Sequence, residues 1–392
     1  MIAIHNINLV ENGMITPCEI GIEKGRIDAI EAPGVLSGRP GTACVDGEGQ
    51  YLSHGFVDIH VHGGGGYDFM DADLEAWHHI STFHLRYGTT QLVPTTLAAD
   101  REGLLAALDA YMACGEGFED GAGFLGIHVE GPYLAAAQCG AQDPRYIRRP
   151  ERKEYEEMIE RCPRILRWTI APEIPGALEM GDYLMTKGIV PCIGHSDATC
   201  EEVRKALLHG YSHITHLYSA MSTIVRRQGF RHAGIVESAY LFPELSSEVI
   251  ADGCHLPGDL LNLAYRQIGP DRLCLITDAM RAAGQMDGES ILGGREDGQR
   301  VIIEDGVAKL PDRKAFAGSI CTADRLVRTM IQQGGASLPD AIRMITATPA
   351  AILGLERETG SVKVGRKADL VLFDRDVHIR KVFRNGILQY AE

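Results

Sequence analysis

The order of hydrophobic and polar residues divides the chain into two kinds of pattern. Before about residue 52, short apolar runs are separated by the turn sequences ENG at 11–13 and KG at 24–25. These runs predict strands at residues 1–7, 18–23, 26–31 and 43–46, with no helix among them. The N-terminal segment is therefore predicted to be all β.

From Leu52 onward, short apolar runs are mostly followed by amphipathic stretches. The runs predict strands at residues 56–60, 89–95, 124–130, 168–173, 189–195, 213–218, 248–255 and 272–278, and helices are predicted at 104–112, 155–161 and 200–208. Eight βα units within about 250 residues predict a (β/α)8 barrel of the TIM type. A doubly wound open sheet is the alternative. It is less favoured because no GxGxxG follows the first strand and polar residues recur at nearly every strand end.

The pattern returns to β at the C-terminus. An insertion at 284–313 contains a predicted hairpin at 301–309, and helices are predicted at 322–333 and 338–345. Strands are then predicted at 360–365, 368–374 and 379–384. We expect them to join the N-terminal strands in a small β-sandwich domain of residues 1–52 and 360–392, beside a barrel domain of residues 53–359.

Composition narrows the function classes. The 392 residues are 45% hydrophobic and 23% charged, as in an ordinary globular protein, and carry a net charge of −15. This charge argues against binding to nucleic acid or to an anionic membrane, and neither a membrane-spanning stretch nor a signal peptide is apparent. The 10 cysteines are scattered singly, as in reduced proteins, which predicts a cytoplasmic location.

Residues that can bind metals stand at the predicted strand ends. His60 and His62 are one residue apart on a strand and therefore point the same way. Later strand ends supply Glu130, His195, His216, His255 and Asp278. A single histidine at a strand end is more often a packing residue, but six strand ends with such groups favour a site for zinc, iron or manganese. A pair of ions bridged by Glu130 is plausible. Asp58 is instead predicted to hold a turn or a neighbouring strand.

Seven segments resemble the amidohydrolase superfamily, and within it the N-acetylglucosamine-6-phosphate deacetylases. They are GFVDIHVHG at 55–63, GIHVEGPY at 126–133, GHSD at 194–197, THLYSAM at 215–221, ITDA at 276–279, FAGS at 316–319 and GRKADLV at 365–371. The resemblance extends over almost the whole chain. Many amidohydrolases use a carbamylated lysine on the fourth strand, but WTIAPE at 168–173 has none, so Glu130 takes that place.

The resemblance implies a role for each of these residues. It assigns Glu130, His195 and His216 to one divalent metal ion and Asp278 to the general acid/base. Some members lack the histidine pair of the first strand and hold one ion. Because this chain keeps His60 and His62, it is expected to hold one or two ions, zinc first and iron or manganese as alternatives, with Glu130 and Asp278 shared.

The resemblance also implies a phosphosugar substrate and a homodimer. The implied substrate-binding residues are Ala141, Gln142, Ser219, Ala220, Arg227, His255, Phe316, Ala317 and Gly318. Three positions depart from the family pattern: Gln142 replaces a histidine, Ser219 replaces an asparagine, and RRQG at 226–229 replaces REPG. Glutamine can donate a hydrogen bond but cannot carry a proton, so the identity of the sugar and acyl group stays open.

Together these features predict a hydrolase that releases acetate from N-acetylglucosamine 6-phosphate. A different N-acylated phosphosugar, such as N-acetylgalactosamine 6-phosphate, is the nearest alternative. A D-aminoacylase or cyclic amidase is another, and would bind a carboxylate where Arg227 is expected to meet phosphate. A catalytically silent binding protein is less favoured, because such a relative would be expected to have lost ligands and above all Asp278.

Overall fold

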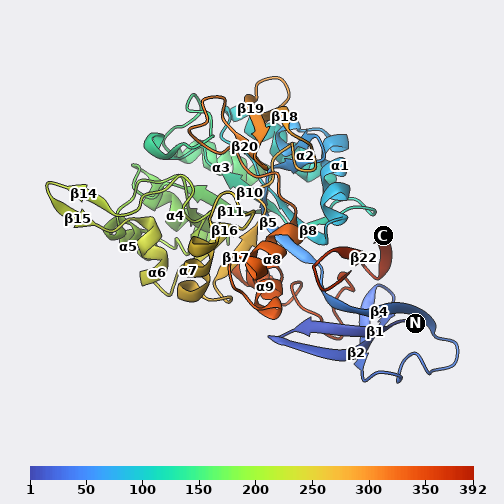
Figure 1. Cartoon of the computed structure of the whole chain (residues 1–392). Coiled ribbons are helices and arrows are strands. Elements are labelled where there is room, and N and C mark those ends of the chain that lie inside the picture. The colour runs from blue at the N-terminus through green and yellow to red at the C-terminus, as the bar shows by residue number, and fades with distance from the viewer.

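Both ends of the chain contribute to one sheet. The computed structural model describes residues 1–392 apart from the side chain of Arg227. The N-terminal strands are β1 (Ile2–Glu11), β2 (Met14–Glu23), β3 (Arg26–Glu31) and β4 (Ala43–His54), and the C-terminal strands are β21 (Leu370–Phe373), β22 (Ile379–Arg384) and β23 (Ile387–Ala391). Their order is β23-β22-β21-β4-β1-β2-β3, with β21 antiparallel to β4. We call this the terminal sheet, and it lies at one end of the molecule (Figure 1).

Nine further strands run parallel in two sheets. One sheet has the order β5 (Phe56–Val61), β8 (Thr89–Pro94) and β9 (Gly123–Phe124). The other has the order β10 (Ile127–Glu130), β11 (Ile165–Ile170), β12 (Val190–Ile193), β13 (His213–Ile214), β16 (Ser246–Ile250) and β17 (Leu273–Ile276). A bridge between Thr95 and His128 joins β8 to β10. On the other side, the N–H of Asp278 donates to the carbonyl of His60 at 2.9 Å.

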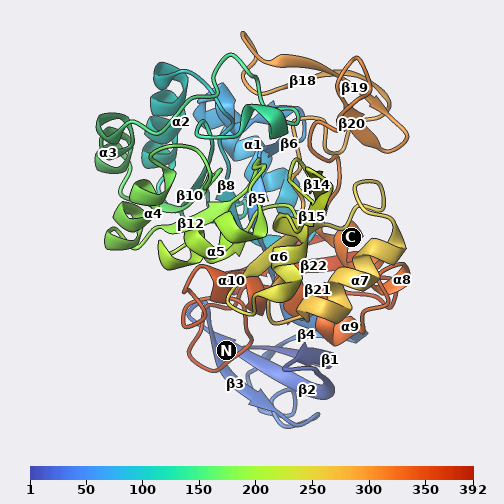
Figure 2. The same cartoon turned by 90° about the vertical axis from the view of Figure 1, so that its left-hand side faces the viewer.

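Helices surround the parallel strands (Figure 2). They are α1 (Leu74–Leu85), α2 (Arg101–Cys114), α3 (Arg152–Arg161), α4 (Ala177–Thr186), α5 (Cys200–Leu208), α6 (Ile235–Leu241), α7 (Gly258–Ile268), α8 (Ala323–Gln332), α9 (Leu338–Ile345) and α10 (Ala347–Ile352). Helix α5 illustrates how the sequence determines where a helix begins and which face it buries. Thr199 and Glu202 form a capping box at its start, and Val203 and Ala206 are buried while the charged side chains stay outside.

Short elements form the rim around the carboxyl ends of the parallel strands. They are β6 (Gly63–Gly64), β7 (Tyr67–Asp68), the 3-10 helices η1 (Phe69–Asp71) and η2 (Ala136–Gln138), and the hairpin β14 (Val225–Arg227) with β15 (Phe230–His232). The insertion contains β18 (Gly288–Leu292), β19 (Gln299–Glu304) and β20 (Val307–Lys309). Its buried Leu292, Val301 and Ala308 pack with Met280, so the insertion is anchored directly beyond β17.

Most of the predicted elements are present. The helices at 200–208 and 338–345 and the strand at 379–384 are confirmed with the same bounds. The strand predicted at 360–365 is wrong, because Gly360 and Gly365 adopt left-handed φ angles of +83° and +88° that interrupt an extended run. Strand β23 was missed, although the Asn385-Gly386 turn precedes it.

Several predicted strands have other bounds in the structure. The strand predicted at 213–218 ends at Ile214, and the range 124–130 contains parts of β9 and β10, which lie in different sheets. Strand β16 ends at Ile250, so the prediction of a strand over 248–255 is too long and His255 lies in the following loop. Asp252 accepts hydrogen bonds from two backbone N–H groups of that loop, at Cys254 and His255, which folds the chain away from the sheet. Strand β11 covers Ile165–Ile170, earlier than the predicted 168–173.

The fold class is confirmed as far as the parallel α/β sheet. For the small domain, the pairing shows the terminal sheet as a single seven-stranded sheet, and the predicted sandwich remains a prediction. Among the described helices, none is both long and apolar enough to cross a membrane. All ten cysteines in the described chain are free.

Candidate metal centre

Strand ends bring the predicted ligands together. His60 and His62 occupy alternate positions at the end of β5, and their Nε2 atoms lie 3.2 Å apart. Glu130 is the last residue of β10. His195 and His216 follow β12 and β13 by two residues each. All five side chains are buried, so five polar groups share a space that is largely closed to water.

The five ligands form two groups that share Glu130. We call them the HxH group (His60, His62 and Glu130) and the His195 group (Glu130, His195 and His216). Within the His195 group, Oε1 of Glu130 lies 3.3 Å from Nε2 of His195 and 3.0 Å from Nε2 of His216. Within the HxH group, Oε2 of Glu130 lies 3.3 Å from Nε2 of His62. Oε1 also lies 3.5 Å from Nε2 of His60, so the Glu130 carboxylate contacts imidazoles of both groups.

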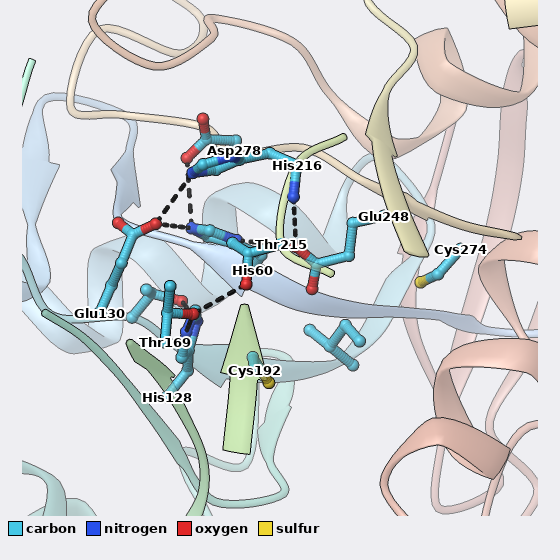
Figure 3. A network of polar contacts seen from close by, with 12 residues as sticks. His60, His128, Glu130, Thr169, Cys192, Thr215, His216, Glu248, Cys274 and Asp278 are labelled. Carbon is cyan, nitrogen blue, oxygen red and sulfur yellow. Dashed lines mark hydrogen bonds and ion pairs between the residues drawn. The ribbon is translucent and has the colours of Figure 1, made fainter. Parts of the chain in front are cut away.

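Asp278 completes the arrangement from the end of β17. Its Oδ1 lies 3.2 Å from Nε2 of His62 and 3.5 Å from Nε2 of His60. Figure 3 shows Glu130 and Asp278 converging on the ring of His60. Burial disfavours the ionised form of Asp278, but the charges of His60 and His62 hold its pKa below its ordinary value. The carboxylate is therefore available to accept a proton at neutral pH.

The donor set fits divalent metal ions. Two imidazole nitrogens face each other at 3.2 Å in the HxH group and at 3.1 Å in the His195 group, too close to remain without a shared proton or cation. Burial opposes the charged form of His60, yet Glu130, Asp278 and Glu248 raise its pKa to about 9. Burial also opposes ionisation of Glu130, but the nearby His60 and His195 keep its pKa well below the usual value. The pocket favours positive charge between ionised carboxylates, as zinc, iron and manganese sites do.

Three of these residues have an uncommon backbone conformation. His195, His216 and Asp278 have left-handed φ angles of 46°, 28° and 46°. Such angles cost roughly 1–3 kcal/mol each in residues other than glycine and cluster at functional sites. Backbone bonds hold them: the carbonyls of His195, His216 and Asp278 accept from N–H groups at 2.9, 2.9 and 2.8 Å. The chain turns sharply after each strand and so directs the side chain into the site.

The imidazoles differ in what contacts the ring nitrogen that faces away from the centre. Nδ1 of His62 lies 3.2 Å from the carbonyl of Thr95, and Nδ1 of His195 lies 3.0 Å from the carbonyl of Gln138. Nδ1 of His60 instead lies 3.1 Å from the carboxylate of Glu248. Sequence reasoning did not single out Glu248. The available signal was an acidic residue between valine, isoleucine and serine in the buried β16.

A cavity of about 500 Å³ opens above the ligands. Of the predicted substrate-binding residues, it is lined by Ala141, Gln142, Ser219, Ala220, His255, Phe316 and Gly318. Ala317 is fully buried in the cluster that anchors the insertion, and the side chain of Arg227 lies outside the described residues. Lys314 also lines the cavity and was not predicted, since nothing in the sequence distinguishes it from other exposed lysines.

Gln142 contacts a metal-ligand residue. Its Nε2 donates to Oε2 of Glu130 at 2.7 Å, while its Oε1 accepts from the N–H of Ala98 at 2.8 Å. Both ends of the amide are therefore used to hold Glu130. The pocket-lining His255 is held by Asp252, whose Oδ2 lies 2.8 Å from Nδ1. Asp58 accepts from the hydroxyl of Thr277 at 2.5 Å, which matches its predicted role of holding a neighbouring strand.

Comparison with known proteins gives one consistent result. Residues 51–388 match the amidohydrolase family. The chain is 34% identical to the N-acetylglucosamine-6-phosphate deacetylase of Lysinibacillus sphaericus, over 87% of this chain and 86% of that protein. It is 32% identical to the N-acetylgalactosamine-6-phosphate deacetylase of Escherichia coli O157:H7, over 97% of each.

Solved structures agree. The N-acetylglucosamine-6-phosphate deacetylase of Pasteurella multocida superposes with a TM-score of 0.92 at 26% identity, covering 100% of this chain and 99% of that one. A mutant of the Mycobacterium smegmatis deacetylase in complex with N-acetyl-D-glucosamine 6-phosphate superposes with a TM-score of 0.88 at 29% identity, with the same coverage.

Proposed function

The chain belongs to the amidohydrolase family and is a metal-dependent amidohydrolase, and on this premise we propose that it removes the acetyl group from N-acetylglucosamine 6-phosphate. The products are glucosamine 6-phosphate and acetate. The single observation that carries the proposal is the placement of Asp278, which lies 3.2 Å from His62 at the base of a cavity of about 500 Å³. An ionised carboxylate beside metal ligands is an arrangement that supports metal-assisted amide hydrolysis.

Different side chains would bind the metal ions and transfer the proton. One or two divalent ions would be held by five side chains: His60, His62, Glu130, His195 and His216. When bound, such an ion acts as a Lewis acid that lowers the pKa of water and polarises a carbonyl. Asp278 takes the proton from the attacking water as the new C–O bond forms, and returns it to the amine nitrogen as the C–N bond breaks. Its lowered pKa keeps it in the accepting form beforehand.

The other substrate-binding residues would position the sugar. The cavity wall combines polar groups at Ser219 and His255 with the apolar Leu97 and Phe316, which suits a sugar ring with hydroxyls at its edges. Lys314 at the same wall and Arg227 would attract the phosphate, with arginine able to bind it in a bidentate manner.

A second candidate substrate is N-acetylgalactosamine 6-phosphate. It is favoured by the Escherichia coli relative, which this chain matches over 97% of both lengths. The structure adds a reason to test it, because Gln142 is held against Glu130 and leaves sugar recognition to other residues. The two sugars differ at C4 alone, so the outcome depends on the side chains that contact that hydroxyl.

The proposal includes the architecture and setting of the enzyme. The parallel strands would close into a (β/α)8 barrel, supported by the bridge of Thr95 to His128 and the bond of Asp278 to His60. Residues 1–52 and 360–392 would form the small domain and residues 53–359 the barrel. Zinc is the proposed ion, since imidazole and carboxylate ligands suit it. A homodimer in the cytoplasm is proposed from the resemblance and from the free cysteines.

Acetate release tests the proposal. Metal-loaded protein should hydrolyse N-acetylglucosamine 6-phosphate with a kcat/KM about 10²-fold or more above that for unphosphorylated N-acetylglucosamine, which corresponds to roughly 2.7 kcal/mol of transition-state binding. N-acetylgalactosamine 6-phosphate belongs in the same assay and identifies the preferred sugar. An N-acyl-D-amino acid and a cyclic amide test the remaining alternatives. Absence of hydrolysis of both phosphosugars would contradict the proposal.

A further inference from the structure

One buried carboxylate contacts both groups of metal ligands from behind. Glu248 lies in the middle of β16, and its side chain is fully buried. Its Oε2 lies 3.1 Å from Nδ1 of His60 and accepts the backbone N–H of His216, also at 3.1 Å. His60 belongs to the HxH group and His216 to the His195 group. Figure 3 shows Glu248 and Glu130 on either side of the ring of His60.

A buried arginine ties this carboxylate to the same two strands. Arg167 of β11 forms an ion pair with Oε1 of Glu248. Its Nη1 also donates to the carbonyl of Ile59 at 3.2 Å, and its Nη2 donates to the hydroxyl of Thr215 at 3.3 Å. Ile59 directly precedes His60, and Thr215 directly precedes His216. The Arg167–Glu248 pair therefore contacts both ligand-bearing segments at two successive residues.

We propose that Glu248, held by Arg167, is a positioning residue that sets the HxH group and the His195 group relative to each other. A carboxylate that accepts from Nδ1–H fixes the tautomer of His60, so the lone pair of Nε2 faces the metal. The same carboxylate fixes the backbone turn at His216. The proposal rests on the proposed function only in requiring divalent ions at the two groups, and the identity of the substrate does not enter it.

The effect on the two groups is unequal. Glu248 touches the ring of His60 but only the backbone of His216, so its loss frees an imidazole in the HxH group and leaves the imidazole of His216 in place. Partners of this kind are worth about 10–100-fold in metal affinity. We therefore expect weakening at the HxH group, while the ion of the His195 group is retained.

Metal binding to substrate-free protein tests the proposal. Glu248→Leu alone leaves Arg167 buried and unpaired, so it is studied beside Glu248→Leu/Arg167→Met, in which both charges and the acceptor oxygen are removed. Bound metal is counted by mass spectrometry, and chelator competition measures the affinity for each ion. One ion should bind with an affinity within about threefold of wild type, and the other should bind about 10–100-fold more weakly. Wild-type affinity for both ions in the double variant would overturn the proposal.

His213→Gln is the matched control. Nε2 of His213 lies 3.1 Å from Oε1 of Glu248, the oxygen that does not contact the ligand groups. Its loss disturbs the same buried network and should leave both ions bound as in wild type. Equal loss of metal in His213→Gln would show a general core defect and would refute the positioning role. Because no substrate is present, the outcome is independent of the acetate-release assay.

A second inference concerns a different cavity, of about 410 Å³, between the terminal sheet and the amino ends of β10 and β11. Its lining includes six cationic side chains: Arg26, Arg164, Arg357, Arg366, Lys367 and Arg384. Only three carboxylates join them: Glu116, Glu358 and Asp369. We call it the junction cavity. It concentrates positive charge in a chain whose net charge is −15.

The cations of the junction cavity outnumber its carboxylates and form no ion pair with the described side chains. Among the described side chains, none of the six lies within 4.0 Å of a carboxylate. Those with hydrogen bonds donate to neutral groups, as Arg26 does to the carbonyl of Gly365 at 2.8 Å and Arg384 to that of Gly121 at 2.7 Å. Arg384 is only 9% exposed, and its Nε has no partner. Cationic charge without an ion-pair partner favours the binding of an anion.

We infer that the junction cavity binds a small phosphorylated anion. Guanidinium groups match phosphate oxygens in pairs, and the cavity volume suits a metabolite rather than a polymer. The site lies at the amino ends of the strands, whereas Glu130 ends β10 at the metal centre. A ligand here would act apart from the catalytic cavity.

Equilibrium dialysis with labelled inorganic phosphate tests this inference on the metal-loaded protein. Arg357→Ala/Lys367→Ala removes two exposed cations of the cavity and should weaken one class of bound phosphate at least tenfold. Arg152→Ala/Lys205→Ala removes two exposed cations from α3 and α5, and should leave phosphate binding unchanged. Identical phosphate binding in wild type and in Arg357→Ala/Lys367→Ala would overturn the inference.

Discussion

The two ligand groups share Glu130 but are supported by different parts of the protein. Behind His60 stands the carboxylate of Glu248, which is fully buried in the middle of β16. Behind His195 stands a backbone carbonyl of Gln138, in the rim helix η2 that borders the cavity. The HxH group is thus built on the sheet interior and the His195 group partly on a loop. Similar ligands can therefore be held by different kinds of group, a buried carboxylate in one case and a backbone carbonyl in the other.

Replacing Glu130, the ligand that both groups share, should disrupt metal binding at both groups and have the largest effect on activity. Glu130→Gln keeps the shape of the side chain but loses the charge that faces both groups. We expect both ions to be lost and kcat/KM to fall by about 10⁴-fold, which corresponds to roughly 5.5 kcal/mol. Metal analysis and acetate release measure the two effects. A variant that retains both ions would show that Glu130 is not shared.

Asp278→Asn separates catalysis from metal binding. The amide keeps the volume of Asp278 and one acceptor oxygen but cannot accept the proton of the attacking water. Since general acid/base groups contribute about 10²–10⁴-fold, we expect kcat to fall by about 10³-fold while the ion of the His195 group stays bound. Single-turnover rates and metal content check this. Loss of both ions in the variant would make Asp278 chiefly a ligand.

Removing the imidazoles of the HxH group alone tests whether the His195 group binds its ion independently. His60→Asn/His62→Asn removes both imidazoles of this group and leaves Glu130, His195 and His216 in place. We expect one ion per chain and a loss of about 10–10²-fold in kcat/KM, because one Lewis acid and Asp278 remain. The readouts are metal stoichiometry and acetate release. A variant without any bound ion would show that the two groups depend on each other.

The smallest effect is a pH dependence of the metal-free protein. The pKa of His60 is raised to about 9 against an ordinary value of 6.5, because Glu130, Asp278 and Glu248 outweigh the effect of burial. Protonation of His60 thus stabilises the folded chain fully below pH 6.5, and this contribution is lost as the pH rises through 9. Thermal unfolding of chelator-treated protein should show a falling Tm over this range. His60→Asn should show a flatter profile, and an identical profile would exclude His60 as the source.

The strand-end principle predicted much of the site. Asking which residues follow apolar runs identified six of its residues: His60, His62, Glu130, His195, His216 and Asp278. In the structure each lies within 3.5 Å of a neighbouring ligand. This worked because parallel strands present their carboxyl ends at one edge. The ion identity and the roles of these residues stay predictions.

What the sequence could not predict depends on contacts between distant segments. Gln142 was expected to face substrate, and only the fold shows its amide bonded to both Glu130 and Ala98. Glu248 and Arg167 are 81 residues apart and lie in apolar strands, and only the fold shows that they form an ion pair. The failure at residues 360–365 is local by contrast, since two glycines in left-handed conformations interrupted an otherwise strand-like pattern.

The pairing of β21 with β4 has a consequence for synthesis of the chain. During translation, β4 is complete at residue 54, but its partner begins at residue 370, more than 300 residues later. At about 5–20 residues per second, the edge of β4 stays unpaired for roughly 15–60 s. An open strand edge is a template for aggregation. Pairing of residues 370–392 with β4 therefore protects a newly made chain from aggregation. A tag after residue 392 that delays this pairing would lower the yield of soluble protein.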